Sequence, residues 1–141
     1  MSQAKISPQL EPLFKAAQTA RSHSYSPYSG HKVGAAIRLK SGQIFSGCNV
    51  ENSSYGATVC AERVAVQKAV SELGKIEIAE VLVITDATPP WPPCGLCRQV
   101  LAEFVAPGEV PLHSCNIDGV VETQPFGEIF PQAFTPGHLK K

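Results

Sequence analysis

The order of helices and strands along the sequence predicts a three-layer α/β/α sandwich around a mixed central sheet of about five strands. Two observations lead to this fold class. Apolar residues recur at helical spacing in some segments and as strand-like runs in others. The later strands alternate with helices, which places helices on both faces of a sheet. With 141 residues, 43% of them hydrophobic, the chain is long enough for one domain, residues 1–141, with a real core.

The first half of the chain predicts a helix, a hairpin and a second helix. Residues 8–24 carry apolar side chains at helical spacing after an early proline, as at a helix start. Residues 33–50 read as two strands joined at Ser41-Gly42, a turn signal. From Cys60 a second helix follows, and Gly74 is a suitable residue to end it.

The second half predicts the remaining sheet. Residues 77–86 form an apolar run that does not alternate, as expected of a buried strand. A proline-rich loop leads into a helix that begins at Gly95 and ends before Pro107-Gly108. Two strands, at 110–115 and 120–124, flank an Ile-Asp-Gly turn, and a short helix with an aromatic tail is expected over 126–134.

The charge balance argues against a large nucleic-acid or membrane-binding surface. Twelve basic and twelve acidic side chains cancel to a net charge of zero. No apolar run is long enough to cross a bilayer, and the first residues lack the apolar segment of a signal peptide. A cytoplasmic location is therefore expected. In that reducing compartment, a C-x-x-C pair points to metal binding or redox chemistry more than to a disulfide.

Three of the five cysteines stand where they can meet. Cys60 opens one predicted helix, and Cys94 and Cys97 open another at C-x-x-C spacing. Helix N-termini lower thiol pKa values, so thiolates form readily there. Glu62 follows Cys60 by two residues, and in a regular helix those side chains diverge. Cys60 must therefore lie at the cap or first turn if both are to serve one site.

Three ligands with one open position are typical of catalytic zinc. Zinc lowers the pKa of its water from about 15.7 to about 7, and a neighbouring carboxylate can move the released proton. Glu62 is the candidate for that role, and Arg63 can donate hydrogen bonds to the sulfurs. The alternatives are a redox pair or a structural zinc module, in which Cys48 or Cys115 would supply the fourth ligand.

The motifs C-A-E at 60–62 and P-C-G-L-C-R-Q at 93–99 resemble the zinc-dependent cytidine/deoxycytidylate deaminase superfamily. Cysteine at the first ligand position is similar to its small, homotetrameric branch, which acts on free nucleosides. The stretches 25–36, 47–56 and 129–134 also look like that branch, so the resemblance covers nearly the whole chain.

The resemblance implies a role for each matching residue. It implies that Cys60, Cys94 and Cys97 bind one zinc ion per chain and that the hydroxide on it attacks C4 of cytosine. Glu62 would carry the proton to the departing ammonia. The other implied roles are ribose binding by Asn49 and Glu51, contact with the base at Ala61, support of the sulfurs by Arg63, and contributions to a neighbouring subunit's pocket by Tyr55 and Phe134.

His31 departs from the family pattern, which usually has a phenylalanine stacked on the base at this position. An imidazole is smaller, forms hydrogen bonds and can carry charge. An altered preference among cytidine analogues is the sharper hypothesis, and a substitution of little consequence at a loop edge is the other.

The expected function is hydrolytic deamination of cytidine and 2′-deoxycytidine to uridine and 2′-deoxyuridine in pyrimidine salvage. The alternatives are a deaminase of a modified cytosine nucleoside, such as an antibiotic or an N4-substituted cytidine, and a non-catalytic zinc module. A nucleic-acid editor is disfavoured, because a bound 3′-hydroxyl leaves no exit for a polynucleotide. The expected partners are a nucleoside substrate and three further copies of the chain, with neither nucleic acid nor a membrane.

Overall fold

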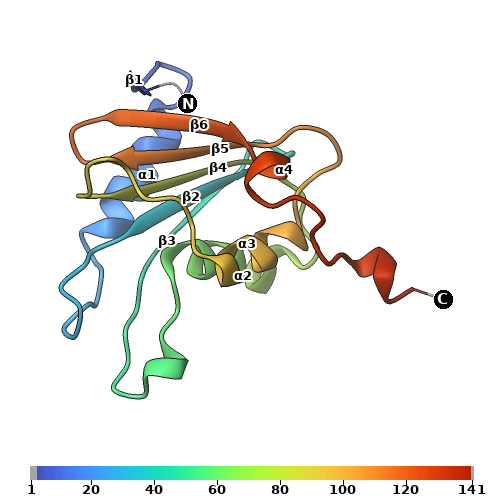
Figure 1. Ribbon diagram of the computed structural model, residues 1–141, viewed down its shortest axis with the longest axis horizontal. Helices are drawn as coiled ribbons and strands as arrows, with labels where there is room; N and C mark the ends of the chain where they lie inside the picture. Colours follow the sequence, from blue (N-terminus) through green and yellow to red (C-terminus); the bar gives the residue numbers. More distant parts are fainter. Residues whose placement is uncertain (1–2, 141) are drawn as a thin grey trace.

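The computed structural model describes residues 3–140, which form a six-stranded mixed sheet with helices on both faces (Figure 1). The strands lie in the order β1-β6-β5-β4-β2-β3, and only the β4–β5 pair is parallel among those described. The predicted three-layer α/β/α fold is confirmed. In chain order the elements are β1 (Gln3–Lys5), α1 (Glu11–Arg21), β2 (Gly34–Leu39), β3 (Ile44–Cys48), η1 (Tyr55–Ala57), α2 (Ala61–Leu73), β4 (Ile78–Thr85), α3 (Gly95–Ala102), β5 (Pro111–Asn116), β6 (Val120–Pro125), α4 (Phe126–Ile129) and η2 (Pro136–His138).

Two details differ from the sequence prediction. The edge strand β1 was not predicted, because its three residues are too few to show a periodic pattern, and pairing with β6 defines it. Helix α3 ends at Ala102, a turn earlier than the predicted end before Pro107. After it, the chain pairs with the start of β4, since the Ile78 amide donates to the Phe104 carbonyl and the Ala106 amide donates to the Ile78 carbonyl. These backbone contacts compete with continuation of the helix.

Helix α1 covers one face of the sheet alone. Its residues Leu13, Phe14 and Ala17 are buried and pack against one side of the central strands. Their partners from the sheet are Ala36, Leu82, Ile84, Cys115 and Val121. Burial of this apolar stripe, rather than intrinsic helix propensity, supplies most of the stability of the layer.

Helices α2 and α3 cover the opposite face. The buried side of α2 is built from small residues, Ala61, Ala65 and Ala69, which let the helix lie close to the sheet. Gly47 on β3 marks the closest approach, because a Cβ atom there would lie 2.6 Å from the Ala65 amide nitrogen. This contact fixes the start of α2 over β3, and so fixes the residue that precedes it, Cys60.

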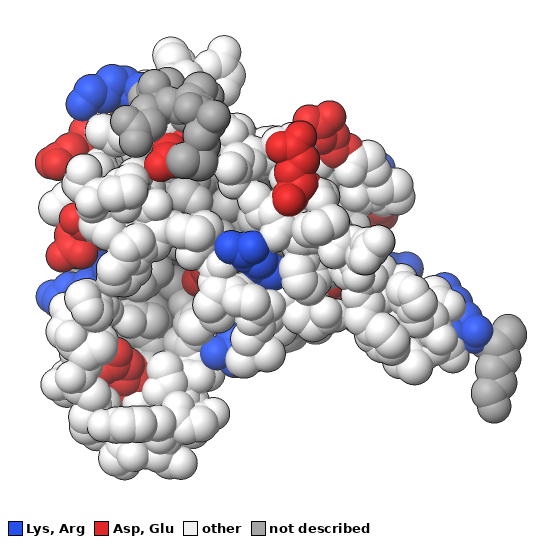
Figure 2. Space-filling view, viewed as in Figure 1, with Lys and Arg blue, Asp and Glu red and all other residues white. Residues whose placement is uncertain are grey.

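The surface carries charges of both signs. On the face drawn in Figure 2, basic and acidic side chains are scattered and neither sign forms a continuous patch. At the sheet edge formed by β3, the Lys68 side chain from α2 donates a 2.5 Å hydrogen bond to the Ser46 carbonyl. Among residues 3–140, no helix is both long enough and apolar enough to cross a membrane.

Candidate functional site

Two helix starts bring three thiols together. Cys60 is the N-cap of α2 and Cys94 is the N-cap of α3, each in an extended conformation, while Cys97 lies in the first turn of α3. The Sγ atoms of Cys60 and Cys94 are 4.0 Å apart, and those of Cys94 and Cys97 are 3.4 Å apart. All three sulfurs lie within 4.8 Å of one another. The predicted cap position of Cys60 is what allows Glu62 to serve the same site.

The sulfurs occupy an environment that favours thiolate. A hydrogen bond from Cys97 lowers the pKa of Cys60 to about 5, and the Arg63 guanidinium lowers it further against the opposing effect of burial. The same contact with Cys60, together with burial, raises the pKa of Cys97. One thiolate is therefore already stabilised, and a cation is the partner that would stabilise the others.

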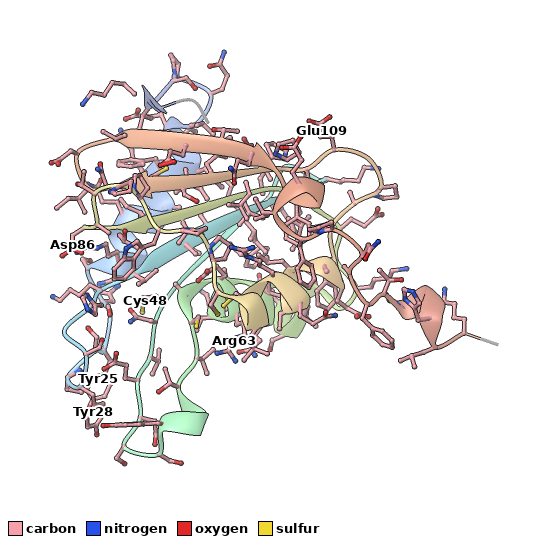
Figure 3. The ribbon with its side chains drawn as sticks, viewed as in Figure 1. Tyr25, Tyr28, Cys48, Arg63, Asp86 and Glu109 are labelled. Carbon is pink, nitrogen blue, oxygen red and sulfur yellow. The ribbon has the colours of Figure 1, made fainter. Side chains whose placement is uncertain are left out.

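Arg63 lies directly beside the cluster (Figure 3). Its Nη2 donates to the Thr58 carbonyl at 3.2 Å and to the Cys60 sulfur at 3.6 Å. Its buried Nε has no acceptor within the described part of the chain. An arginine with a spare donor at this place fits a centre with net negative charge, as three thiolates around a divalent ion would have.

The donor set therefore fits zinc, with an open fourth position. Cys48 is half-buried on β3 and Cys115 is buried in the core beneath α1, where burial raises the pKa of its thiol to about 12. The metal-competent group within residues 3–140 comprises Cys60, Cys94 and Cys97 and includes neither of these. The four-cysteine structural module considered from the sequence finds no support in this arrangement.

Glu62 points into the same site from the first turn of α2. Its side chain is only 4% exposed, whereas a glutamate side chain free in water is ionised at neutral pH. Burial raises the pKa of its carboxyl to about 7, and the nearby Cys60 thiolate adds to the rise. A carboxyl poised in this range can both accept and return a proton.

A cavity of about 280 Å³ joins these groups. Its lining brings the predicted Asn49, Glu51 and Ala61 together with Glu62. The full lining is Val33, Asn49, Glu51, Thr58, Cys60, Ala61, Glu62, Val83, Thr85, Trp91, Pro92 and Cys94. Mostly apolar walls with few polar groups are typical of a small-molecule site.

Asn49 holds the loop that borders the cavity. Its Oδ1 accepts a 3.0 Å hydrogen bond from the Val33 amide and another from the Ser24 hydroxyl. Its Nδ2 donates to the His31 carbonyl at 2.8 Å. The second N–H of this amide is free of any such contact among the described residues, and a ligand can use it.

Glu51 binds the middle of the same loop. Its Oε1 accepts hydrogen bonds from the Tyr28 amide at 2.9 Å and the Ser29 amide at 3.1 Å, and its Oε2 accepts one from the Ser29 hydroxyl. The Ser29 hydroxyl, followed by these amides, lowers the pKa of the carboxyl. Glu51 is therefore an ionised acceptor at the cavity wall that also orders the loop.

Tyr55 and Phe134, which the resemblance assigned to a neighbouring subunit's pocket, lie outside the cavity lining. Tyr55 is 76% exposed and Phe134 is 54% exposed. Tyr55 packs against Tyr28, with 5.9 Å between ring centroids, and the Phe134 carbonyl accepts a hydrogen bond from Gln99. Within a single chain, neither side chain contributes to the sulfur site.

His31 does not line the cavity, but it packs against a lining residue that sequence reasoning missed. Its ring centroid is 5.2 Å from that of Trp91, and the two planes meet at 63°. Trp91 itself lines the cavity. The available signal in the sequence was its position between two prolines, three residues before Cys94. A single tryptophan in a loop can line a pocket or lie on the open surface, and the sequence alone does not decide between these two places.

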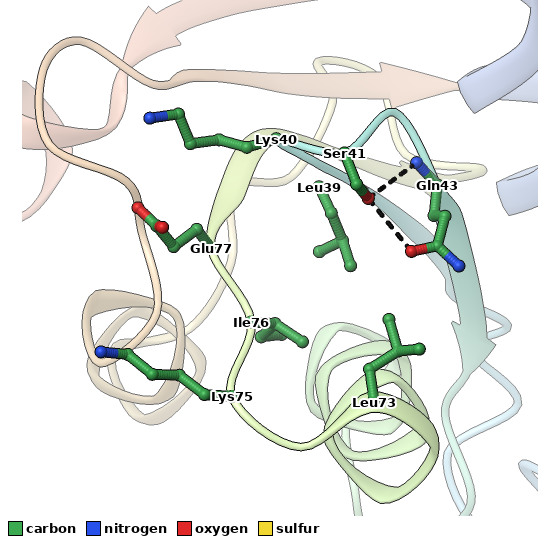
Figure 4. A pocket seen from close by; sticks show the side chains of 8 residues that line it. All are labelled: Leu39, Lys40, Ser41, Gln43, Leu73, Lys75, Ile76 and Glu77. Carbon is green, nitrogen blue, oxygen red and sulfur yellow. Dashed lines mark hydrogen bonds between the residues drawn. The ribbon is translucent and has the colours of Figure 1, made fainter.

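A second hollow, of about 480 Å³, lies away from the sulfurs, beside the β2–β3 turn (Figure 4). It is lined by Leu39, Lys40, Ser41, Gln43, Leu73, Lys75, Ile76 and Glu77. The Ser41 hydroxyl donates to the Gln43 side chain at 3.1 Å. This hollow is larger than the sulfur site, but its lining contains no cysteine or histidine and shares no residue with the thiol cluster.

Comparison with known proteins agrees with this geometry. Residues 7–113 match the family model described as the cytidine and deoxycytidylate deaminase zinc-binding region. A cytidine deaminase from Halalkalibacterium halodurans is 44% identical over 123 residues, 87% of this chain and 92% of that protein. One from Sporosarcina psychrophila is 42% identical over 130 residues, 92% of this chain and 94% of that protein.

A solved structure shows the same fold. The crystal structure of cytidine deaminase from Burkholderia pseudomallei superimposes with a TM-score of 0.81 at 40% sequence identity, covering 88% of this chain and 98% of that one. The matched family region contains both helix starts and all three clustered cysteines. The chain therefore belongs to the cytidine and deoxycytidylate deaminase family.

Proposed function

We propose that the protein catalyses the zinc-dependent hydrolytic deamination of cytidine and 2′-deoxycytidine to uridine and 2′-deoxyuridine, as in pyrimidine salvage. The observation that carries this proposal is a cluster of three thiols, two of which line the same cavity as one buried carboxyl. The family match and the similarity to cytidine deaminases support the choice of substrate.

Cys60, Cys94 and Cys97 would hold one zinc ion per chain. When bound, zinc lowers the pKa of a water molecule from about 15.7 to about 7 and so supplies a nucleophile at neutral pH. The Arg63 guanidinium offsets the negative charge of the thiolates and keeps the Cys60 sulfur oriented through its hydrogen bond.

Glu62 carries the proton between the water and the base. Its carboxyl is buried beside the sulfurs, so it can accept the two protons of the water in turn, delivering the first to N3 and the second to the departing amino group. The apolar side chains of Val33 and Val83 line the same cavity and limit the access of bulk water. Ammonia then leaves as the neutral product.

A free nucleoside fits the polar groups at the wall. Asn49 retains one N–H donor and Glu51 is an ionised acceptor, a combination suited to a sugar hydroxyl. A structural zinc module would need a fourth protein ligand, which this cluster lacks among the described residues. A modified cytosine nucleoside remains the alternative substrate, because it would use the same sulfurs and Glu62.

The assembly proposed for the protein is a homotetramer with shared active sites. Tyr55 and Phe134 are large, exposed aromatic side chains, as residues at subunit interfaces commonly are. The cytoplasmic location expected from the sequence also stays a prediction. The presence of all five cysteines as free thiols suits a reducing compartment.

The test is the loss of cytidine absorbance with purified protein, read beside zinc content per chain and mass in solution. Turnover at about one zinc per chain supports the proposal. Zinc without turnover of cytidine or 2′-deoxycytidine contradicts it, and turnover confined to modified cytidines would establish the alternative substrate. A monomeric, fully active protein would contradict the shared active site.

A further inference from the structure

Trp91 is a large aromatic side chain with no role in the core. It is 44% exposed and belongs to neither cluster of buried apolar residues. It lines the cavity that contains the sulfurs and Glu62, and it is the only tryptophan in the sequence. An exposed indole kept at a cavity wall is available for a ligand, because flat aromatic surfaces pack well against planar rings.

Two features hold this indole in place. Prolines precede and follow it in the sequence, and their fixed φ angles restrict the backbone on both sides. On its other side, the His31 ring packs edge-to-face at 5.2 Å. His31 is itself anchored through its carbonyl to Asn49. Trp91 is therefore a pre-ordered part of the cavity wall, supported by the His31 ring that packs against it.

The chemistry of the reaction decides which edge of a cytosine ring would face this wall. The inference rests on the proposed function, in which C4 with its amino group lies beside the sulfurs. In the pyrimidine ring, N3 and C5 flank C4 on opposite sides. Glu62 serves N3 and the leaving nitrogen from the start of α2. The C5 side then faces the wall that continues from Cys94 through Pro92 to Trp91.

We propose that Trp91, held by His31, contacts the C5 edge of the cytosine ring and sets the preference among cytosine nucleosides substituted at C5. A fixed indole at this edge leaves little room for a bulky substituent. The protein therefore prefers cytidine to 5-bromocytidine, and removal of the indole reduces that preference.

Selective excitation of the single tryptophan reports on the contact directly. Zinc-loaded protein is titrated with uridine, the reaction product, while Trp91 emission is recorded. We expect a saturable change in emission, and in His31→Ala we expect roughly 2- to 10-fold weaker binding, the size of one aromatic contact. Unchanged emission at uridine concentrations that fully inhibit turnover would overturn the proposal.

Kinetics with Trp91→Ala test the preference. We expect the KM for cytidine to rise roughly 2- to 10-fold with kcat and zinc content nearly unchanged, and the ratio of kcat/KM for cytidine over 5-bromocytidine to fall. Ile117→Ala is the matched control, because Ile117 is also 44% exposed and does not line the cavity. If Trp91→Ala behaves like this control, the proposal is wrong.

The two hypotheses fail in different ways. If the wild-type protein deaminates cytidine and Trp91→Ala matches the control, the proposed function stands and only the role of Trp91 falls. If the wild type does not deaminate cytidine, the proposed function falls, and the emission titration still decides whether Trp91 contacts a nucleoside.

Discussion

Cys60 and Cys94 begin different helices, yet their Sγ atoms lie 4.0 Å apart. The sheet makes this possible, because α2 and α3 pack side by side on one face and both start at the same end (Figure 1). A metal bound there would join two helices that the sequence separates, so metal content and stability should be linked.

Substitution of Cys94 tests that link. We expect Cys94→Ala to lose zinc and to unfold at a lower temperature than the wild type, because two thiols bind the ion far more weakly than three. Zinc analysis and thermal unfolding measure both effects. Cys48→Ala is the control, since Cys48 lies outside the cluster, and it should keep its zinc. Retention of about one zinc per chain in Cys94→Ala would refute the ligand assignment.

Substitution of Glu62 separates proton transfer from metal binding. Glu62→Gln preserves the shape of the side chain but cannot accept and return a proton. We expect zinc content to stay the same and kcat to fall by about 10²- to 10⁴-fold. Glu72→Gln, on the exposed side of α2, should leave both unchanged. Normal turnover by Glu62→Gln would exclude Glu62 as the proton carrier.

The pH dependence of stability should reveal a polar cluster on the sheet. The Nε2 atom of His113 lies 2.6 Å from Oε2 of Glu80, and Arg38 donates to Oε1 of the same carboxylate at 3.2 Å. The hydrogen bond from His113, followed by that from Arg38, holds the pKa of Glu80 below its ordinary 4.5. The native state therefore keeps this carboxylate ionised at pH values where the unfolded chain has protonated it.

It follows that the stabilisation by Glu80 is fully present above the ordinary carboxyl pKa and is lost as the pH falls through the lower native value. We expect Glu80→Gln to lower the free energy of unfolding by roughly 1–3 kcal/mol at neutral pH and to flatten the decline in acid. Urea unfolding across this pH range measures both. Glu77→Gln, an exposed neighbour, should retain the wild-type slope. An unaltered slope in Glu80→Gln would argue against the cluster.

The close contact between β3 and α2 gives a steric prediction. A methyl group on Gly47 would meet the Ala65 nitrogen and the Ala61 carbonyl, which are backbone atoms that cannot easily move. We expect Gly47→Ala to cost roughly 1–3 kcal/mol of stability and to reduce kcat, because α2 carries Glu62. Gly127→Ala is the control, since nothing lies within 4 Å of the position that its methyl group would take. Equal stabilities for the two variants would contradict this account.

Substitution of His31 tests whether the departure from the family pattern matters. Phenylalanine keeps an aromatic edge against Trp91 but removes the ring N–H groups. We expect His31→Phe to change the order of preference among N4- and ribose-modified cytidines, measured as relative kcat/KM. His23→Phe, at an exposed histidine outside the cavity, should keep the wild-type order. If His31→Phe and the wild type show the same order of kcat/KM values, the hypothesis that His31 alters substrate preference is wrong.

The sequence predicted the parts of the site that depend on short-range order. Cys60 and Cys94 could be placed at helix starts because the preceding loops and the following apolar spacing are local signals. The family resemblance assigned Asn49 and Glu51 to the site. Their hydrogen bonds to the loop at 24–33 could not be predicted, because they depend on tertiary contacts. Trp91 was missed for the same reason, since its role depends on His31, 60 residues earlier in the sequence.

The arrangement of the sheet edges also bears on how the protein behaves at high concentration. Unpaired strand edges can pair with other chains and so nucleate aggregates. One edge strand, β1, has only three residues, too short to template an extended ladder. At the other edge, Lys68 brings a positive charge to β3 and occupies the Ser46 carbonyl. Both edges are therefore poor templates for intermolecular β-pairing, and we expect the protein to resist fibril formation even though its strands are rich in apolar residues.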